Sequence, residues 1–201
     1  VDSVRGAENY LVSNLTNAEN ESANNVSSLN SDGFSLGSAG SVNTNGEEYV
    51  AWCWKAGGDA VTNTDGSITS EVSANVDAGF SIVSWSPTAA GTVGHGLSSE
   101  PKVIIAKRRN LDAEWLVYTS TTGANQKLVL NTTAAAASTG VWNNTSPTET
   151  VFTSGSAFSA LNNIAYCFAE VAGFSKFGSY TGNSSTQSIN VGFEAAFVMV
   201  K

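Results

Sequence analysis

The chain has 201 residues, of which 41% are hydrophobic and only 13% are charged, and its formal net charge is −8. We expect no binding of nucleic acid or of an anionic membrane surface, because both need clustered Lys and Arg. Membrane insertion is not expected either, since no apolar run approaches the length of about 20 residues that a spanning helix needs. The apolar fraction suffices for compact cores. A surface rich in Ser, Thr, Asn and Gly is typical of extracellular or virion proteins.

The first third of the chain combines a polar segment with one clear strand pattern. Residues 13–31 are polar and predict a long exposed loop. Asp32-Gly33 and Asn45-Gly46 predict tight turns, because these pairs adopt positive φ at low steric cost. In Val50–Lys55, the large residues alternate with Ala, Cys and Lys, which indicates a half-buried strand. We expect Trp52 and Trp54 to lie in a core.

The rest of the chain also has strand character. The predicted strands are Lys102–Lys107, Trp115–Tyr118, Lys127–Leu130, Ile164–Ala169 and Ala196–Lys201. The first and last of these are apolar runs closed by Lys, a pattern typical of strands buried on both faces. Only 131–138 could form a short helix. Closely spaced strands without a long helical period predict an all-β sandwich.

An internal repeat organises these elements. Residues 79–107 align without a gap with residues 173–201, both beginning Gly-Phe-Ser and ending in Lys. Likewise 1–16 aligns with 118–133, and Val50–Lys55 with Ile164–Ala169. The repeat predicts two tandem β-sandwich modules of jelly-roll or lectin-like type, comprising residues 1–107 and 108–201. The chain would open partway through a unit, so we expect it to be a segment of a longer protein.

Catalytic and metal-binding patterns are weak. The only histidine is His95, and its repeat counterpart is Ile189, so no base is paired with a nucleophile in both copies. Residues 63–67 resemble part of a calcium loop, but Val61 and Val72 would occupy its first and twelfth positions. We predict no enzyme activity, no metal and no cofactor.

The two cysteines occupy equivalent repeat positions, Cys53 and Cys167, each flanked by aromatic residues. Equivalent sites in two separate modules would not lie within bonding distance of each other. We therefore predict that each is a buried, free thiol.

Aromatic residues at positions where the copies differ are the remaining site candidates. Trp85, Trp142 and Tyr180 lie near polar loops, and Asn143 and Asn144 follow Trp142 directly. Exposed aromatic rings beside amide side chains are suited to bind sugars by stacking and hydrogen bonding. These five residues are the predicted glycan contacts. The alternative is that the rings pin loops to their own module.

Several longer strings resemble one known family. These are Glu48–Gly58, Asn63–Ser70, Val72–Ile82, Val141–Asn144 and Gly173–Asn183. They resemble a repeat module in large tail-fibre or appendage proteins of marine bacteriophages, and the Trp-Cys-Trp-Lys block is the most specific match. The resemblance implies a virion or extracellular location and a structural role. It supplies no catalytic residues.

Three hypotheses follow from the sequence. The first is a structural virion component, a tail fibre or similar appendage that attaches to the host surface. Its expected partners are further copies of itself, with a trimer as the usual form of a fibre, other virion proteins and a host cell-surface glycan. The second is a monomeric lectin-like module whose main role is to bind carbohydrate. The third, an enzyme such as a depolymerase, has the weakest basis.

Overall fold

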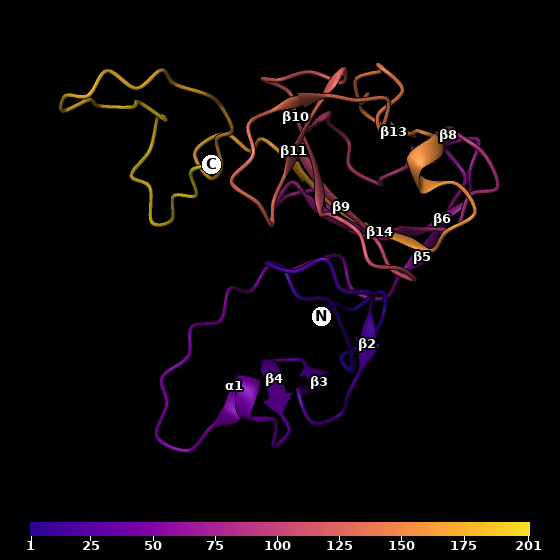
Figure 1. Cartoon of the computed structure of the whole chain (residues 1–201), viewed down its shortest axis with the longest axis vertical. Helices are drawn as coiled ribbons and strands as arrows, with labels where there is room; N and C mark the ends of the chain where they lie inside the picture. The colour runs from indigo at the N-terminus through magenta and orange to yellow at the C-terminus, as the bar shows by residue number, and fades with distance from the viewer.

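A computed structural model describes all residues, 1–201, and it is nearly all-β (Figure 1). Eight antiparallel strands form the main sheet in the order β12-β11-β10-β9-β14-β7-β6-β5. Their bounds are β5 (Val61–Asn63), β6 (Ser70–Asn75), β7 (Phe80–Trp85), β9 (Pro101–Arg108), β10 (Leu116–Thr119), β11 (Gln126–Val129), β12 (Ala137–Ser138) and β14 (Asn163–Ala169). The prediction of an all-β protein is confirmed.

Three two-stranded sheets accompany the main sheet. They are formed by β1 (Asn9–Tyr10) with β2 (Asn20–Glu21), β3 (Val26–Asn30) with β4 (Gly33–Leu36), and β8 (Gly91–Gly94) with β13 (Val151–Ser154). The helical elements are short: α1 (Gly40–Asn43) and the 3-10 helix η1 (Ser156–Phe158). The predicted turn at Asp32-Gly33 joins β3 to β4. The polar segment 13–31 is therefore not wholly a loop, because it contains β2 and β3.

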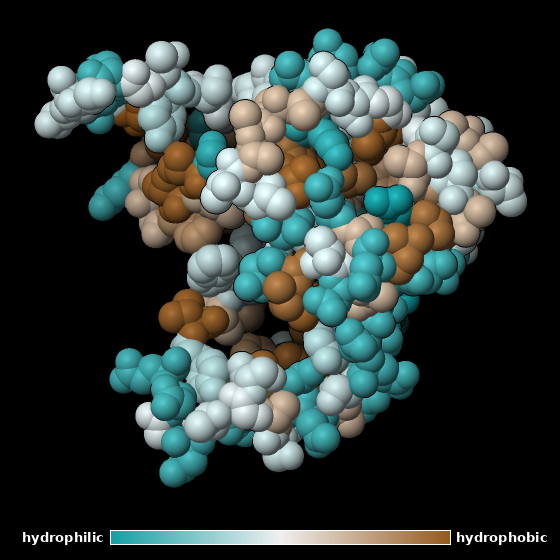
Figure 2. Space-filling model, viewed as in Figure 1, coloured by the Kyte–Doolittle hydropathy of each residue, from teal (hydrophilic) through white to brown (hydrophobic).

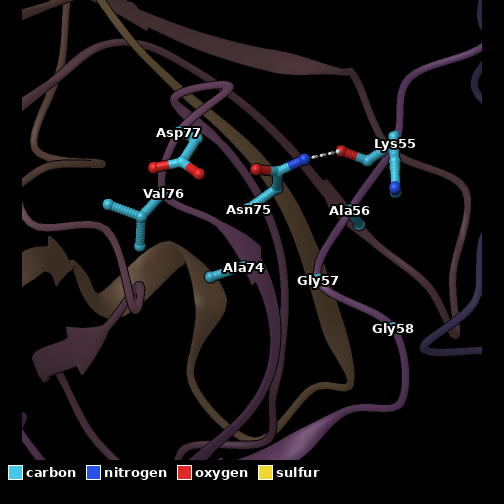
Figure 3. Close-up of a pocket in the computed structure, with 8 residues that line it drawn as sticks. All are labelled: Lys55, Ala56, Gly57, Gly58, Ala74, Asn75, Val76 and Asp77. Atoms are coloured by element: carbon cyan, nitrogen blue, oxygen red, sulfur yellow. Dashed lines mark hydrogen bonds between the residues drawn. The ribbon is translucent and has the colours of Figure 1, made fainter.

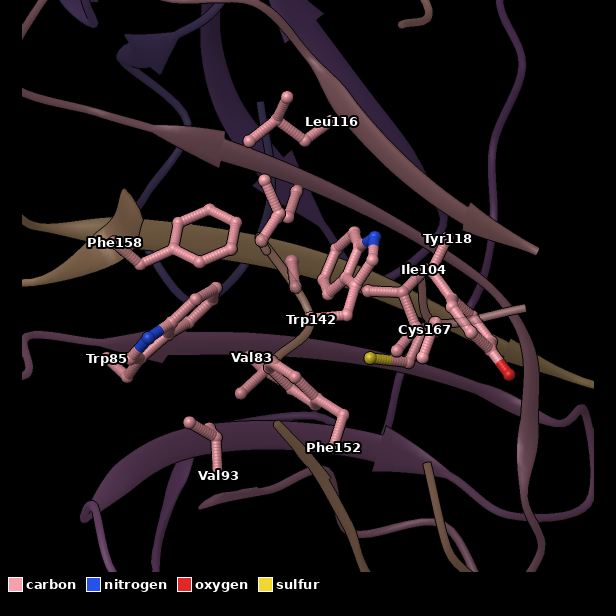
Figure 4. Packing of buried hydrophobic residues seen from close by; sticks show 14 of the residues in the cluster. Val83, Trp85, Val93, Ile104, Leu116, Tyr118, Trp142, Phe152, Phe158 and Cys167 are labelled. Atoms are coloured by element: carbon pink, nitrogen blue, oxygen red, sulfur yellow. The ribbon is translucent and has the colours of Figure 1, made fainter. Parts of the chain in front are cut away.

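The largest core lies on one face of the main sheet (Figure 4). Alternate residues of β7 and β14 point to this face, among them Val83, Trp85 and Cys167. Phe152 from β13 and Phe158 from η1 cover them, and both rings meet Trp85 edge-on at centroid distances of 5.3 and 5.4 Å. The fold thus buries this face beneath β8, β13 and the chain that follows β12.

The opposite face of the same strands carries a smaller apolar cluster. Its buried residues are Phe80, Ile82 and Ile164. Residues 1–20, which we call the N-terminal segment, lie against it through Val4 and Leu11. β7 and β14 are therefore apolar on both faces, as expected for central strands of a covered sheet.

The main sheet combines strands from both predicted modules. Residue 107 lies inside β9, and β14 pairs with β9 on one side and with β7 on the other. In this register Ile164 lies opposite Lys107 and Ala165 opposite Val83. The division into tandem sandwiches at 1–107 and 108–201 is not confirmed, because hydrogen bonding across that boundary forms the centre of one sheet.

The backbone nevertheless supports the repeat at two glycine pairs. Gly79 and Gly173 are equivalent in the alignment and have φ of 63° and 74°. Gly6 and Gly123 are also equivalent, with φ of 91° and 77°. Such left-handed conformations favour glycine. At both pairs, the two copies of the repeat therefore share the same backbone conformation and the same residue.

Two predicted strands do not form. Val50–Lys55 and Ala196–Lys201 are irregular and exposed, although their repeat counterparts are β14 and the apolar part of β9. The structure has no helix at 131–138, where only the short edge strand β12 occurs. We call residues 49–55 the N-terminal arm and residues 173–201 the C-terminal arm. In Figure 1 the C-terminal arm is the yellow trace that extends from the main sheet without strands.

Candidate functional site

Trp85 and Trp142, two of the predicted glycan contacts, are core residues. Their exposed fractions are 2% and 1%. The Trp85 indole donates a hydrogen bond to Ser154 Oγ at 3.0 Å, and the Trp142 ring meets Tyr118 at a centroid distance of 6.0 Å (Figure 4). The prediction was wrong for both residues, because a ring with no exposed face cannot stack on a sugar.

The other three predicted contacts are exposed but do not converge. Asn143 and Asn144 form a turn with φ of 48° and 51°, a conformation that Asn tolerates better than most residues. Tyr180 lies on the C-terminal arm, and no hydrogen bond or ring contact joins it to either asparagine. The five residues therefore do not form one site.

His95 is fully buried and holds two loops together. Its Nδ1 accepts a hydrogen bond from the Leu97 amide at 3.1 Å, which leaves Nε2 to donate to the Thr148 carbonyl at 3.2 Å. Burial lowers the pKa of His95, so the ring is neutral at physiological pH. A neutral ring with both nitrogens engaged in backbone hydrogen bonds has a structural role here.

The two thiols lie in different surroundings. Cys167 is fully buried, and burial raises the pKa of its thiol to about 12, which makes it unreactive. Cys53 is exposed, so the prediction that both thiols are buried holds for Cys167 alone. No three His, Cys, Asp or Glu side chains lie together in a way that could hold a metal ion.

A buried charge cluster fastens the N-terminal segment to the main sheet. Arg5 donates to Asp2 Oδ2 at 2.7 Å, to Glu19 Oε2 at 2.5 Å and to the Tyr166 hydroxyl at 3.1 Å. Tyr166 in turn donates to Asp2 at 2.7 Å, and Arg109 donates to Glu19 at 2.6 and 2.9 Å. The cluster joins residues that are far apart in sequence, so it fixes where the N-terminal segment lies.

Charge pairing in this cluster outweighs burial. Burial alone would raise the pKa of the Asp2 carboxyl, but the Arg5 charge and hydrogen bonds from Tyr166 and Arg5 hold it below its usual value. The pKa of Glu19 is lowered in the same way, against burial, by hydrogen bonds from Arg109 and Arg5. Burial is the largest influence on Tyr166 and raises its pKa, so the phenol stays protonated and can donate.

An open hollow lies between the end of the N-terminal arm and the β6–β7 hairpin (Figure 3). It has a volume of about 420 Å³ and is lined by Lys55, Ala56, Gly57, Gly58 and residues 74–77. The Asn75 amide donates to the Lys55 carbonyl at 3.1 Å across it. An adjoining hollow shares Lys55, Asn75 and Asp77, and Phe174 forms part of its wall. The hollows together offer an ammonium, an amide, a carboxylate and one exposed ring.

The most unusual surface of the molecule is formed by its two arms. Val50 is 85% exposed and Trp52 is 65% exposed, far more than expected for large apolar residues. The other large apolar or aromatic side chains that the arms expose are Tyr49, Trp54, Phe174, Tyr180, Ile189, Phe197, Val198, Met199 and Val200. Figure 2 shows brown, hydrophobic residues on both sides of the recess between the C-terminal arm and the N-terminal part. The exposure of so many large apolar side chains distinguishes the two arms from the well-packed main sheet.

The fold and this surface define an all-β protein with exposed apolar segments beside a well-packed sheet. No helix in it is long and apolar enough to cross a membrane. The chain belongs to the family described as a domain of unknown function (DUF7483), whose model matches residues 1–201. Neither the curated proteins nor the solved structures contain a match.

Proposed function

We propose that this protein is a self-associating structural module that builds an extended assembly. The observation that carries this proposal is the exposed apolar surface of the two arms, on which Val50, Trp52 and Val198 are all more than half exposed. Burial of each such side chain contributes about 1.5–3 kcal/mol.

The assembly we propose is a bacteriophage tail fibre or similar virion appendage that attaches to the host surface. The resemblance carried by Glu48–Gly58 and Gly173–Asn183 supports it, as do the low charge and polar loops of an extracellular or virion surface. Further copies of the chain and other virion proteins are the proposed partners, and a trimer is the form we expect in a fibre. We propose no catalytic role, because the lone His95 and the buried Cys167 are both held in structural settings.

Light scattering coupled to size exclusion tests the self-association. The purified chain should elute as an oligomer whose mass falls on dilution, and Trp52→Ser or Val198→Ser should shift it toward monomer. Leu29→Ser is a matched control, because Leu29 is also exposed but lies outside both arms. A chain that is monomeric at every concentration would contradict the proposal.

Glycan binding is a second candidate function, and the hollows beside Lys55 favour it. Asn75 and Asp77 could bind sugar hydroxyls, while the exposed Phe174 ring could stack on a sugar face. On an array of bacterial surface glycans, Asp77→Ala and Phe174→Ala should each abolish any signal. Asp59→Ala is the control, since Asp59 is exposed and outside the lining residues. Binding that survives both test substitutions would exclude this site.

A further inference from the structure

We infer that the N-terminal arm of one copy pairs, strand to strand, with the C-terminal arm of a second copy. The repeat identifies both segments as counterparts of strands that already pair in the main sheet. Val50–Lys55 corresponds to β14, while residues 174–179 and 197–201 correspond to β7 and to the part of β9 that pairs with β14. β14 lies between β7 and β9. By analogy, Val50–Lys55 of one copy would insert between residues 174–179 and residues 197–201 of the other copy.

The main sheet specifies the register of this pairing. In it, Cys167 lies opposite Ile104 of β9 and opposite Ser81 of β7. Transferred through the alignment, Cys53 of one copy lies opposite Val198 and Ser175 of the other. A slip by one residue would turn every side chain to the wrong face, so this register is a specific expectation.

The same transfer places large apolar side chains against one another. Phe168 of β14 lies opposite Phe80 and Val103 in the main sheet, and the Phe80 and Phe168 rings meet at a centroid distance of 5.0 Å. In the alignment their counterparts in the arms are Trp54, Phe174 and Phe197, respectively. Cross-strand pairs of aromatic residues stabilise a sheet by about 0.2–1 kcal/mol each.

A single chain leaves this pairing unmade. No backbone–backbone hydrogen bond involves Val50–Lys55 or residues 176–201. Within one chain the arms meet only through side chains, with the Trp52 and Phe197 rings at a centroid distance of 5.5 Å. The rings are thus compatible, and the backbone groups of Val50–Trp54, of residues 176–179 and of residues 197–201 make no hydrogen bond within the chain, so they remain available for a partner. A second copy carries the complementary strands, and exchange of identical elements is a low-cost route to assembly.

This inference deepens the proposed self-association, on which it rests, by assigning the segments and register that produce it. Each copy has one arm of each kind, so exchange can occur in two ways. Reciprocal exchange between two copies would close a dimer, whereas head-to-tail exchange would build a chain.

Disulfide trapping tests the register directly. Cα atoms of residues directly opposite in antiparallel strands are about 4.5–5.5 Å apart, which suits a disulfide bond. A tagged chain carrying Cys53→Ser and Val198→Cys is mixed with the untagged wild-type chain and treated with oxidised glutathione. Disulfide-linked dimers of one tagged and one untagged chain should appear on a non-reducing gel. Met199→Cys in place of Val198→Cys should give several-fold less of this dimer, because residue 199 points to the opposite face of the strand. Cys167 does not interfere, because it is fully buried.

The Val198→Cys chain with Cys53 intact separates a neighbouring copy from the same chain. Disulfide-linked dimers and higher species would support pairing between copies. A faster-migrating monomer, locked within one chain, would overturn the inference, and so would the absence of any bond. Light scattering of the wild-type chain is measured in parallel. If that chain is oligomeric while the trapping fails, the proposed function stands and only this route of assembly falls.

Discussion

β14 and the N-terminal arm show how similar sequences reach different outcomes. Ile164–Ala169 lies at the centre of the main sheet between β9 and β7. Val50–Lys55 has the same alternation of large and small residues, but it is exposed and makes no backbone ladder. The difference lies in the neighbours, because β14 finds both of its partner strands within the fold. Alternation therefore indicates the capacity to form a strand, while the available partners decide whether the strand forms.

The largest expected effect is on the free energy of unfolding, and it differs between a buried tryptophan, Trp142, and an exposed one, Trp52. Trp142→Ala should lower the free energy of unfolding by about 3–5 kcal/mol, because it leaves a cavity beside Tyr118 and Phe158. Trp52→Ala should change it by less than about 0.5 kcal/mol, because the ring is mostly exposed. Urea denaturation at a concentration where the chain is monomeric measures both. Equal losses for the two variants would show that the N-terminal arm is part of the core.

The next effect concerns how the N-terminal segment is held. Arg5→Met should destabilise that segment by about 3 kcal/mol, because Asp2 and Glu19 lose a buried positive partner. Hydrogen exchange should rise sharply over residues 1–20 and little in β7 and β14. Arg109→Met is the matched control, and its effect should be smaller because Arg109 is more exposed than Arg5. Uniform loss of protection throughout the sheet would contradict a local role for the cluster.

The sequence predicted the strands that find partners within the chain and misjudged those that do not. Lys102–Lys107, Trp115–Tyr118 and Ile164–Ala169 all lie in or overlap main-sheet strands. Their burial follows from local pattern alone. The pairing of β14 with β7 and β9 does not, because local alternation cannot reveal which strand lies next to which.

The candidate site was predicted less well, for a physical reason. Trp85 was expected at the surface because the two copies of the repeat differ there and polar loops lie near it along the chain, but its ring packs against Phe152 in the core. Polar neighbours along the chain say little about where a ring points. The hollow beside Asn75 and Asp77 was missed, although the nearby glycines Gly57 and Gly58 carried a signal. Gly57 closely approaches the Ala74 backbone, and only glycine allows that approach.

A smaller effect is expected at the repeat-equivalent glycines. Gly79→Ala should cost about 1–3 kcal/mol, because φ is positive and a Cβ atom would lie 2.5 Å from the Ala169 carbonyl oxygen. Gly173→Ala meets no atom within 4 Å, so only the strain of positive φ, about 1 kcal/mol, remains. Thermal unfolding of the two variants measures the difference. If Gly173→Ala proves as costly as Gly79→Ala, the C-terminal arm is packed in solution as tightly as the main sheet.

The smallest effect is a dependence of stability on pH. It has one part from His95 in the core and another from the charge cluster of the N-terminal segment. The pKa of His95 is lowered by burial, so below about pH 6.5 the unfolded chain binds a proton that the folded chain does not. Stability of the main sheet should therefore fall with decreasing pH, by at most about 1.4 kcal/mol per pH unit. Asp2 and Glu19 have lowered pKa values, so the stability they contribute is present above about pH 4 and is lost below it.

Two variants assign these pH windows. His95→Gln should flatten the upper window, measured by urea denaturation between pH 4.5 and 7, and leave the lower one intact. Arg5→Met should remove most of the lower window, measured by hydrogen exchange of residues 1–20 between pH 2.5 and 4.5. Because His95 lies within the main core and Arg5 holds the N-terminal segment, separate windows would show that the two regions open independently. A single transition, shifted alike by both variants, would instead mean that the charge cluster is part of the same cooperative unit as the sheet.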